Sequence, residues 1–336
     1  MGIFAVLIVV GLYYVKWMPY FEKIFFAKNN HTIGTSFLFG QSGVIPHASI
    51  SSAFQYVFNY VKSIWQALIL GLIAGSGIKA VIPDRLVIDK LQKPGLKNIL
   101  LGSVFSLPCM MCTCCSTPVA IGMRQKRASV GSVVSWWLAN PVLNPATLVL
   151  IGFVLGWKWL FFRLILGSLM VVSVAFMAEK WPPSKKYTAR ISLPYEDRSE
   201  TGILAKWWHE FKTLALGLIP EYLVIVLLLG ISRSWLFPVQ SVHDGIFWIV
   251  MMALAGTIFV VPTAGEIPIL QTMLSFGLGV GPAVALLLTL PAVSLPSLVM
   301  MRKVFSLRLR LLIAGSILLA GIIAGLIASV FLGFFT

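Results

Sequence analysis

All four cysteines of the chain fall within seven residues, in the segment Cys109-Met-Met-Cys112-Thr-Cys114-Cys115. Thiolates are soft ligands that prefer soft metals, and the two intervening methionines add thioether sulfur. Such a cluster could bind a thiophilic species, for example a soft metal ion, a trivalent metalloid or its organic derivative, and pass it between sulfurs. The candidate substrate ligands are Cys109, Cys112, Cys114 and Cys115. We expect Cys112 and Cys114 to be the transient ligands of the soft species, with Cys109 or Cys115 assisting.

Two other interpretations of the cysteines remain open. Cys109 and Cys112 have the C-x-x-C spacing of a thiol-disulfide pair, which would make the chain a membrane-embedded thiol-disulfide oxidoreductase. Membrane thiol carriers usually need a second cysteine pair to receive electrons, and the chain has only these four cysteines. Cysteine can also be a small buried hydrophobic residue. Scattered cysteines would favour that reading more than a cluster beside Pro118 does.

Two carboxylates lie within apolar stretches of the sequence. Glu266 is flanked by Gly265 and Pro268, and Glu221 follows Pro220 in the middle of an apolar window. An ionisable residue at membrane depth is costly and is functional by default. Either carboxyl could therefore bind a proton or a cation in exchange for substrate. Alternatively, Glu266 could hydrogen-bond freed backbone, and Glu221 could be a buried carboxyl that desolvation keeps protonated.

Two Asn-Pro pairs follow the cysteines, Asn140-Pro141 and Asn144-Pro145. Proline removes a backbone donor, and asparagine amides offer polar groups that could line a path. We therefore add Asn140 and Asn144 to the candidate substrate-binding residues. The prolines expected to mark helix breaks are Pro118, Pro141, Pro145, Pro268 and Pro291.

The composition identifies the surroundings of these residues as a lipid bilayer. Of 336 residues, 58% are apolar and 11% are charged, whereas about 25% are charged in a typical soluble domain. This excludes a soluble globular protein, a disordered chain and a disulfide-stapled secreted module. The excess of 26 basic over 11 acidic residues fits orientation-setting loops better than a nucleic-acid partner. The expected partners are lipid and a small-molecule or metalloid substrate. We expect no cofactor, and a homo-oligomer stays open.

Seven apolar windows approach the length of about 20 residues that a membrane-spanning helix needs. They lie at 3–20, 63–82, 128–152, 157–178, 212–232, 280–301 and 309–334. Two further apolar stretches, 98–123 and 246–277, have Pro-rich centres at 108–118 and 262–268. A lipid-facing helix would not tolerate such centres, because its backbone groups must be satisfied inside the bilayer. We predict that these two stretches are re-entrant hairpins or broken helices.

Charge placement predicts the orientation, since basic residues in short loops mark the cytoplasmic side. Basic clusters lie at 79–97 and 124–127, on either side of the first broken stretch, and again at 180–212 and 302–310. A hairpin that leaves on the side it entered puts all four clusters on one side. We therefore predict a multi-pass protein of the inner (plasma) membrane with a cytoplasmic N-terminus. The first window lacks a basic n-region and a cleavage site, so we expect a retained anchor.

An internal repeat is visible when the sequence is compared with itself at a shift of 150 residues. This shift aligns Lys62 with Lys212, Pro118 with Pro268, Gly131 with Gly281 and Pro141 with Pro291. Each copy has the order span, broken stretch, span, span, and the two copies begin from opposite sides. Inverted repeats with broken helices are typical of secondary transporters, whose substrate site lies where the breaks converge.

These patterns predict an all-α integral membrane protein, a polytopic bundle of two inverted repeats, each with a broken or re-entrant hairpin. An N-terminal anchor helix and connecting loop occupy 1–61. The first repeat, with the Cys-rich segment, occupies 62–180, a cytoplasmic linker 181–211 and the second repeat 212–336. The predicted activity is transport and not enzymatic catalysis.

Two stretches of the sequence resemble a family of predicted permeases that includes the organoarsenical efflux permeases (ArsP-like) and the YraQ-like proteins. They are CTCCSTPVAIGMRQKRASVGSVVSWWLANPVLNPATL, which begins at Cys112, and the weaker echo VVPTAGEIPILQTMLSFGLGVGPAVALLLTLPAVSLPSL, which begins at Val260. Positions that match the family pattern are Cys112, Cys114, Pro118, Gly131, Asn140, Pro141, Asn144 and Pro145.

The resemblance implies an inner-membrane exporter, for example of trivalent organoarsenicals. The sequence departs from the commoner family pattern by carrying Cys115 beside Cys114 and the additional Cys109. The substrate could therefore also be another soft metal or metalloid, or a sulfur or selenium compound. We expect a secondary transporter that exports a thiophilic small solute through a cysteine-lined site near the membrane midplane.

Overall fold

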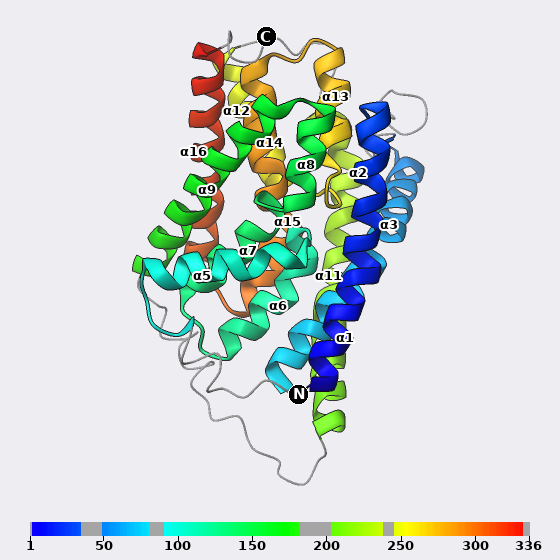
Figure 1. The fold of residues 1–336 in the computed structure, drawn as a ribbon, viewed down its shortest axis with the longest axis vertical. Coiled ribbons are helices and arrows are strands. Elements are labelled where there is room, and N and C mark those ends of the chain that lie inside the picture. Colours follow the sequence, from blue (N-terminus) through cyan, green and yellow to red (C-terminus); the bar gives the residue numbers. More distant parts are fainter. Residues whose placement is uncertain (1, 35–48, 81–90, 182–202, 238–244, 332–336) are drawn as a thin grey trace.

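The computed structural model describes residues 2–34, 49–80, 91–181, 203–237 and 245–331, and the regular structure in these ranges is helical throughout (Figure 1). Seven helical segments within them are long and apolar enough to cross a membrane. Their bounds are Gly2–Asn30, Ile50–Ala80, Val130–Val154, Trp157–Lys180, Leu204–Leu236, Val280–Lys303 and Leu307–Val330. Each contains most of one predicted window. The prediction of an all-helical, multi-pass membrane protein is confirmed.

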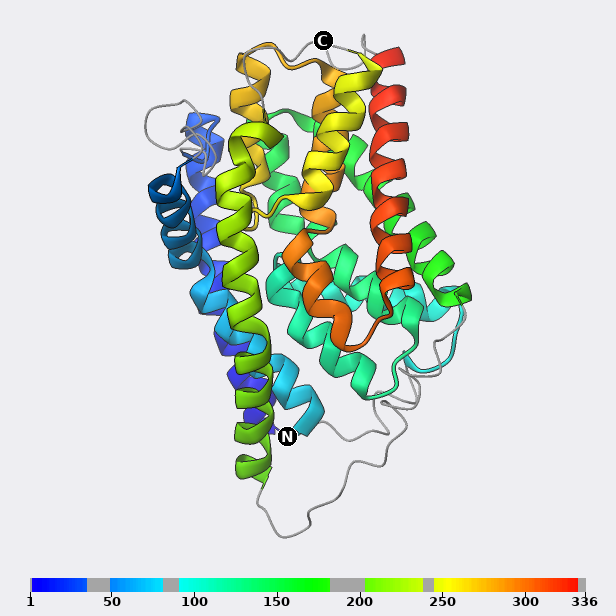
Figure 2. The ribbon, with the colours of Figure 1, turned by 180° about the vertical axis from the view of Figure 1, so that it is seen from behind.

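The N-terminal anchor is one long helix with an irregular centre. It consists of α1 (Gly2–Leu12), a π-helical turn η1 (Tyr13–Trp17) and α2 (Met18–Asn30). It rises along one side of the bundle, and α3 (Ile50–Ala80) then descends beside it (Figures 1 and 2). The single turn of π-helix is notable because such bulges occur mostly inside α-helices at functional sites.

The two predicted broken stretches are pairs of short helices. The first consists of α5 (Leu96–Ser106), a 3₁₀ turn η2 (Leu107–Cys109) and α6 (Thr113–Gln125). The second consists of α12 (Ile246–Ile258) and α13 (Glu266–Ser275). None of these helices has the roughly 20 residues that a full crossing requires, so both stretches are interrupted, as predicted.

The remaining helices complete the bundle and also contain interruptions. After the first pair come α7 (Val130–Val142), α8 (Pro145–Val154) and α9 (Trp157–Lys180). The long helix α11 (Ile203–Leu236) precedes the second pair. After that pair come α14 (Val280–Ala292), α15 (Leu295–Met300), the short η3 (Met301–Lys303) and α16 (Leu307–Val330). The spans α7–α8 and α14–α15 are thus each broken near their centre.

Helices of the two halves correspond in position but run in opposite directions. The starting residues of α5, α7, α8 and α9 each lie 150 residues before those of α12, α14, α15 and α16. In Figure 1, α9 descends whereas α16 rises, and α3 descends whereas α11 rises. The ends of α6 and α13 point to opposite ends of the bundle in both views (Figures 1 and 2).

The first short-helix pair enters and leaves at the same end of the molecule. The backbone N–H of Ser129, just after α6, donates to the carbonyl of Leu91, just before α5, at 2.8 Å. Lys79 at the end of α3 pairs with Glu210 near the start of α11, with Nζ and Oε2 2.6 Å apart, so these helix ends also meet. Most of the predicted linker, residues 182–202, and the basic loop 81–90 lie outside the described residues.

A stripe of glycines lets α3 contact the backbone of α6. A Cβ added at Gly71 would lie 2.1 Å from the Cys115 carbonyl oxygen, and one at Gly75 would lie 2.4 Å from that of Pro118. A Cβ at Gly122 of α6 would in turn lie 2.6 Å from the Gly75 carbonyl oxygen. Membrane helices pack closely through such small residues, since lipid provides no hydrophobic driving force between them. These glycines hold the cysteine-bearing helix against α3.

Candidate functional site

The first helix break lies at Met110 to Cys112, directly before the cluster of cysteines. Met110 has a left-handed backbone conformation (φ 48°), and Cys112 is the N-cap of α6. The freed N–H of Met111 donates to the side-chain oxygen of Asn140 in α7 at 2.7 Å, and both residues are buried. Asn140, predicted to contact substrate, therefore also satisfies the backbone of the break, as a buried donor requires.

Three of the four cysteine thiols are buried in the first turn of α6. The Cys112 and Cys115 sulfurs are 3.0 Å apart, because residues three apart share one face of a helix. The Cys114 sulfur lies on another side, 3.4 Å from the hydroxyl oxygen of Ser294 at the break between α14 and α15. Cys109 lies before the break and is half-buried. Cys112 and Cys115 thus form a close thiol pair. That Cys112 and Cys114 bind the substrate stays a prediction.

All four cysteines are free thiols. Within the part of the chain that the structure describes, no group of three or more His, Cys, Asp or Glu side chains could hold a metal ion. Among the described residues, the cysteine cluster therefore does not form the four-ligand arrangement of a structural zinc site.

The second helix break, from Phe259 to Gly265, contains no cysteine and leads into the carboxylate of Glu266. Its backbone is satisfied from α3, where the Tyr56 hydroxyl donates to the Val260 carbonyl at 2.8 Å. Ala264 has a left-handed conformation (φ 66°), which closes the turn before α13. Glu266 is the first residue of that helix, where the positive end of the helix dipole favours a negative charge.

Glu266 forms an ion pair with Arg163 of α9 in the centre of the bundle. The Arg163 Nη1 and Glu266 Oε1 atoms are 2.9 Å apart, and the two side chains are 0% and 2% exposed. The same guanidinium donates to the carbonyls of Pro141 and Val142, each at 3.0 Å. These carbonyls belong to the last turn of α7, before its break. Arg163 therefore links the break in the first half to the break in the second half.

Sequence reasoning missed Arg163, although a signal was present. It is an ionisable residue six positions inside the apolar window that begins at 157, and such residues usually pair with another charge or with backbone carbonyls. Charge counting treated basic residues only as markers of loops. The structure instead gives this arginine a position at the junction of the helix breaks.

The other predicted carboxylate lies away from the breaks. Glu221 of α11 is ion-paired with Arg302 of η3, and both side chains are partly exposed, at 29% and 54%.

Four prolines predicted to mark breaks lie inside helices. Pro118 is within α6, Pro268 is in the first turn of α13, and Pro141 and Pro291 are in the last turns of α7 and α14. Proline is tolerated at position 268 because an N–H in the first turn would lack an intrahelical partner anyway. Pro118, Pro141 and Pro291 instead each remove one hydrogen bond from their helix.

In the two remaining breaks, a side chain caps the helix that follows. The two capping residues, Asn144 and Ser294, lie 150 residues apart. Asn144, the residue before Pro145, accepts from the backbone N–H groups of Ala146 and Thr147 at 3.0 and 3.3 Å, and so caps α8. Ser294 caps α15 in a reciprocal capping box with Ser297. The side-chain NH₂ groups of Asn140 and Asn144 are buried, with no hydrogen-bond partner among the described residues.

The breaks converge on a void that is almost closed. A cavity of about 10 Å³ is lined by residues of all these segments: Cys112, Thr113, Pro141, Thr263, Glu266 and Ser294. That volume is near the minimum of about 10–15 Å³ that a single water needs. The void is therefore large enough for about one water molecule and for nothing larger.

The N-terminal anchor contacts both breaks through its π-helical turn. The Trp17 indole N–H donates to the carbonyl of Pro108, before the first break, at 2.8 Å. The Lys16 ammonium lies 3.5 Å from the hydroxyl oxygen of Thr263 in the second break. Sequence reasoning treated this helix only as an anchor, although a lysine in the interior of an apolar span was again a signal.

Comparisons with known proteins identify the family. Residues 49–330 match a family described as "Predicted permease". The chain is 43% identical to UPF0718 protein YraQ of Escherichia coli (strain K12), over 98% of this chain and 95% of that protein. It is 20% identical to UPF0718 protein MJ0584 of Methanocaldococcus jannaschii, over 79% of this chain and 92% of that protein. No solved structure matches the chain.

The matches confirm the resemblance found in the sequence, and they do not support the oxidoreductase alternative. The family match begins at residue 49 and so omits the N-terminal helix, whereas the YraQ match includes it. The chain belongs to this family of predicted permeases and is a multi-pass membrane transport protein.

Proposed function

We propose that the chain is a secondary transporter that exports a thiophilic small solute, such as a trivalent organoarsenical, across the inner membrane. The observation that carries this proposal is the burial of three thiols at the point where helix breaks of both halves converge. The substrate site of transporters built this way lies at such a convergence. The close pair Cys112 and Cys115 acts as the first soft ligand set, and Cys114 beside Ser294 receives the solute next.

The proposal includes an inverted repeat. It is supported by the 150-residue offset of four helix starts and by the opposite directions of corresponding helices (Figure 1). Movement of one half against the other would open the closed void alternately to the two sides. The basic helix ends at the lower end of Figure 1 then face the cytoplasm together with the N-terminus.

Glu266 is the proposed coupling residue. Protonation of its carboxyl would remove the charge that holds Arg163, and Arg163 also binds the carbonyls that end α7. A proton at this one position would therefore loosen the contact between the two halves. Thiol ligands also release protons when they bind a soft centre. Proton exchange at Glu266 in the second half is thus linked to solute binding at the thiols of the first half.

Uptake of trivalent arsenicals into everted membrane vesicles tests the proposal. We expect Cys112→Ser and Cys115→Ser each to abolish bidentate capture and to lower uptake of phenylarsine oxide more than Cys109→Ser does. Cys109→Ser is the matched control, because that thiol lies before the break and is only half-buried. Unchanged uptake in both Cys112→Ser and Cys115→Ser, at equal protein levels, would refute the thiol mechanism.

A further inference from the structure

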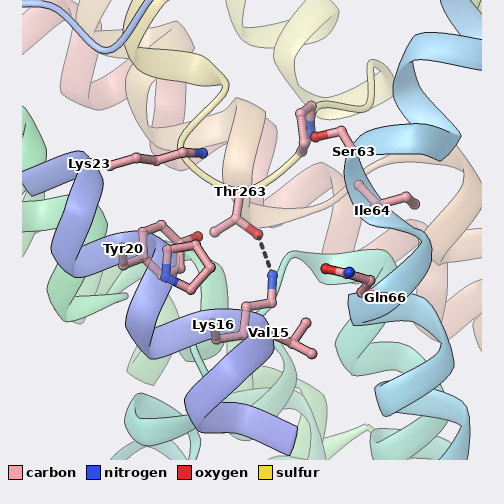
Figure 3. A pocket seen from close by; sticks show the side chains of 10 residues that line it. Val15, Lys16, Tyr20, Lys23, Ser63, Ile64, Gln66 and Thr263 are labelled. Carbon is pink, nitrogen blue, oxygen red and sulfur yellow. Dashed lines mark hydrogen bonds between the residues drawn. The ribbon is translucent and has the colours of Figure 1, made fainter. Parts of the chain in front are cut away.

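A second, larger cavity lies between the N-terminal helix, α3 and the second break (Figure 3). Its volume is about 140 Å³, which is close to that of a cavity of about 150 Å³ known to accept one benzene molecule. Its polar lining consists of Lys16, Tyr20, Lys23, Ser63, Gln66 and Thr263. None of the residues that line it is acidic.

Lys16 supplies a buried positive charge to this cavity. Its side chain points from the N-terminal helix toward Thr263 (Figure 3), and the residue is 8% exposed. An ammonium has three donors, and that of Lys16 makes a long hydrogen bond of 3.5 Å to the hydroxyl oxygen of Thr263. Among the described residues, the ion pairs are Lys79–Glu210, Arg163–Glu266 and Arg302–Glu221, so Lys16 has no carboxylate partner there. A buried charge without a counter-charge is costly.

Neighbouring groups add to the positive and donor character of the cavity. Lys23 lies two turns further along the same helix and also points into the space (Figure 3). Ser63 and Gln66 line it from α3 and can donate hydrogen bonds from a hydroxyl and an amide. Two ammonium groups together with neutral donors form the kind of set that binds a negatively charged oxygen group.

Both the π-helical turn and the polar face of α3 contribute side chains to this cavity. Lys16 lies within the π turn, whose neighbour Trp17 is fixed to the first break. On α3, Gln55, Asn59, Ser63 and Gln66 are exposed and follow helical spacing toward the cavity. Polar residues in a membrane helix usually face a water-filled space, since exposure to lipid is costly. These four residues form a polar stripe on α3, and its last two members line the cavity that contains Lys16.

The cavity adjoins the thiol site. Thr263 and Pro262 line both this cavity and the small void that contains Cys112. One small molecule could therefore place a soft atom at the cysteines and an anionic group at Lys16.

We propose that this cavity binds the anionic oxygen group of the transported solute, so that the substrate class is a thiophilic small molecule that also carries a carboxylate or comparable oxyanion. This inference rests on the proposed thiol-dependent function. Lys16 is the principal anion ligand, and Lys23, Ser63 and Gln66 complete the site.

A matched pair of arsenicals tests the inference on the purified full-length protein in detergent. Phenylarsine oxide is neutral, and 4-carboxyphenylarsine oxide differs from it only by one carboxylate. By calorimetry we expect the carboxylate form to bind about tenfold to hundredfold more tightly, the range expected for a hydrogen bond to a charged group. Lys16→Met should remove this preference, and Lys16→Arg should retain part of it. Lys28→Met, an exposed lysine of the same helix, should leave it intact.

Two further measurements separate this inference from the thiol proposal. Cys112→Ser should weaken binding of both arsenicals equally while leaving weak, Lys16-dependent binding of benzoate and sulfate. In the wild-type protein, benzoate should compete with the carboxylated arsenical and not with the neutral one, a test that needs no variant to fold. Equal affinity for the two arsenicals in the wild type, or a preference that survives in Lys16→Met, would overturn the anion site. A wild-type protein that binds benzoate through Lys16 but binds neither arsenical would overturn only the thiol proposal.

Discussion

The break at 110–112 and the break at 259–265 follow helices that start 150 residues apart, yet their chemistry differs. The first is followed by thiols, and an asparagine amide satisfies its backbone. The second has no thiol, and it leads into a carboxylate whose charge is balanced by Arg163. Equal architecture therefore carries soft ligands in one half and a hard ion pair in the other. The comparison suggests that binding and coupling are divided between the two halves.

The largest expected effect comes from breaking the ion pair that joins the two regions. Arg163→Met leaves Glu266 charged and buried without a partner, which should lower the free energy of unfolding by about 3–5 kcal/mol. Thermal unfolding in detergent measures the change. The double variant Arg163→Met/Glu266→Gln should recover most of it, because no uncompensated charge remains. If the double variant is as unstable as the single one, the pair does not act through its charge.

A smaller effect is expected where α3 contacts the first break. Gly71→Ala would put a Cβ 2.1 Å from the Cys115 carbonyl oxygen, and overpacking of this kind costs about 1–3 kcal/mol. The displaced turn should also slow the reaction of Cys115 and Cys112 with a dithiol-selective arsenical. Gly315→Ala in α16 is the control, since a Cβ there meets nothing within 4 Å. Equal behaviour of the two variants would contradict the close approach.

Removing the backbone partner of each break compares the two regions directly. Asn140→Leu leaves the buried N–H of Met111 unsatisfied, which costs about 1–3 kcal/mol. Tyr56→Phe removes a donor from the Val260 carbonyl, and the net loss of such a hydrogen bond is about 0.5–1.5 kcal/mol. Chemical denaturation of both variants should therefore rank the first break as the more sensitive. The reverse order would mean that the second break depends more on its side-chain support.

The smallest difference is expected at the caps of the two half-helices. Asn144→Ala removes the acceptor for two N–H groups of α8, and Ser294→Ala removes one side of the capping box of α15. Each change should cost about 0.5–2 kcal/mol. Ser294→Ala should in addition alter the reactivity of Cys114, which the serine hydroxyl contacts. The rate at which a thiol reagent labels Cys114 measures this effect. An unchanged labelling rate in Ser294→Ala would mean that the serine acts only as a helix cap and not on the thiol.

Much of the architecture was predictable because lipid imposes simple rules on the sequence. Apolar length identified the seven spans, and prolines with polar neighbours identified the interrupted stretches 98–123 and 246–277. The cysteine cluster was found because four thiols in seven residues need no tertiary information to be seen. The exact breaks were harder to predict, since Pro118 fits inside a helix whose preceding residues are unwound.

By itself, the sequence determined the class, the spans and the cluster of cysteines proposed to bind a soft solute, because hydropathy and residue type are local properties. Only the tertiary structure decided which residues meet. It joined Glu266 to Arg163 across 103 positions, and it brought Lys16 of the N-terminal helix to Thr263. The physical reason is that a buried charge or a freed backbone group takes whatever partner the packing of distant helices brings within reach, and sequence spacing does not record that.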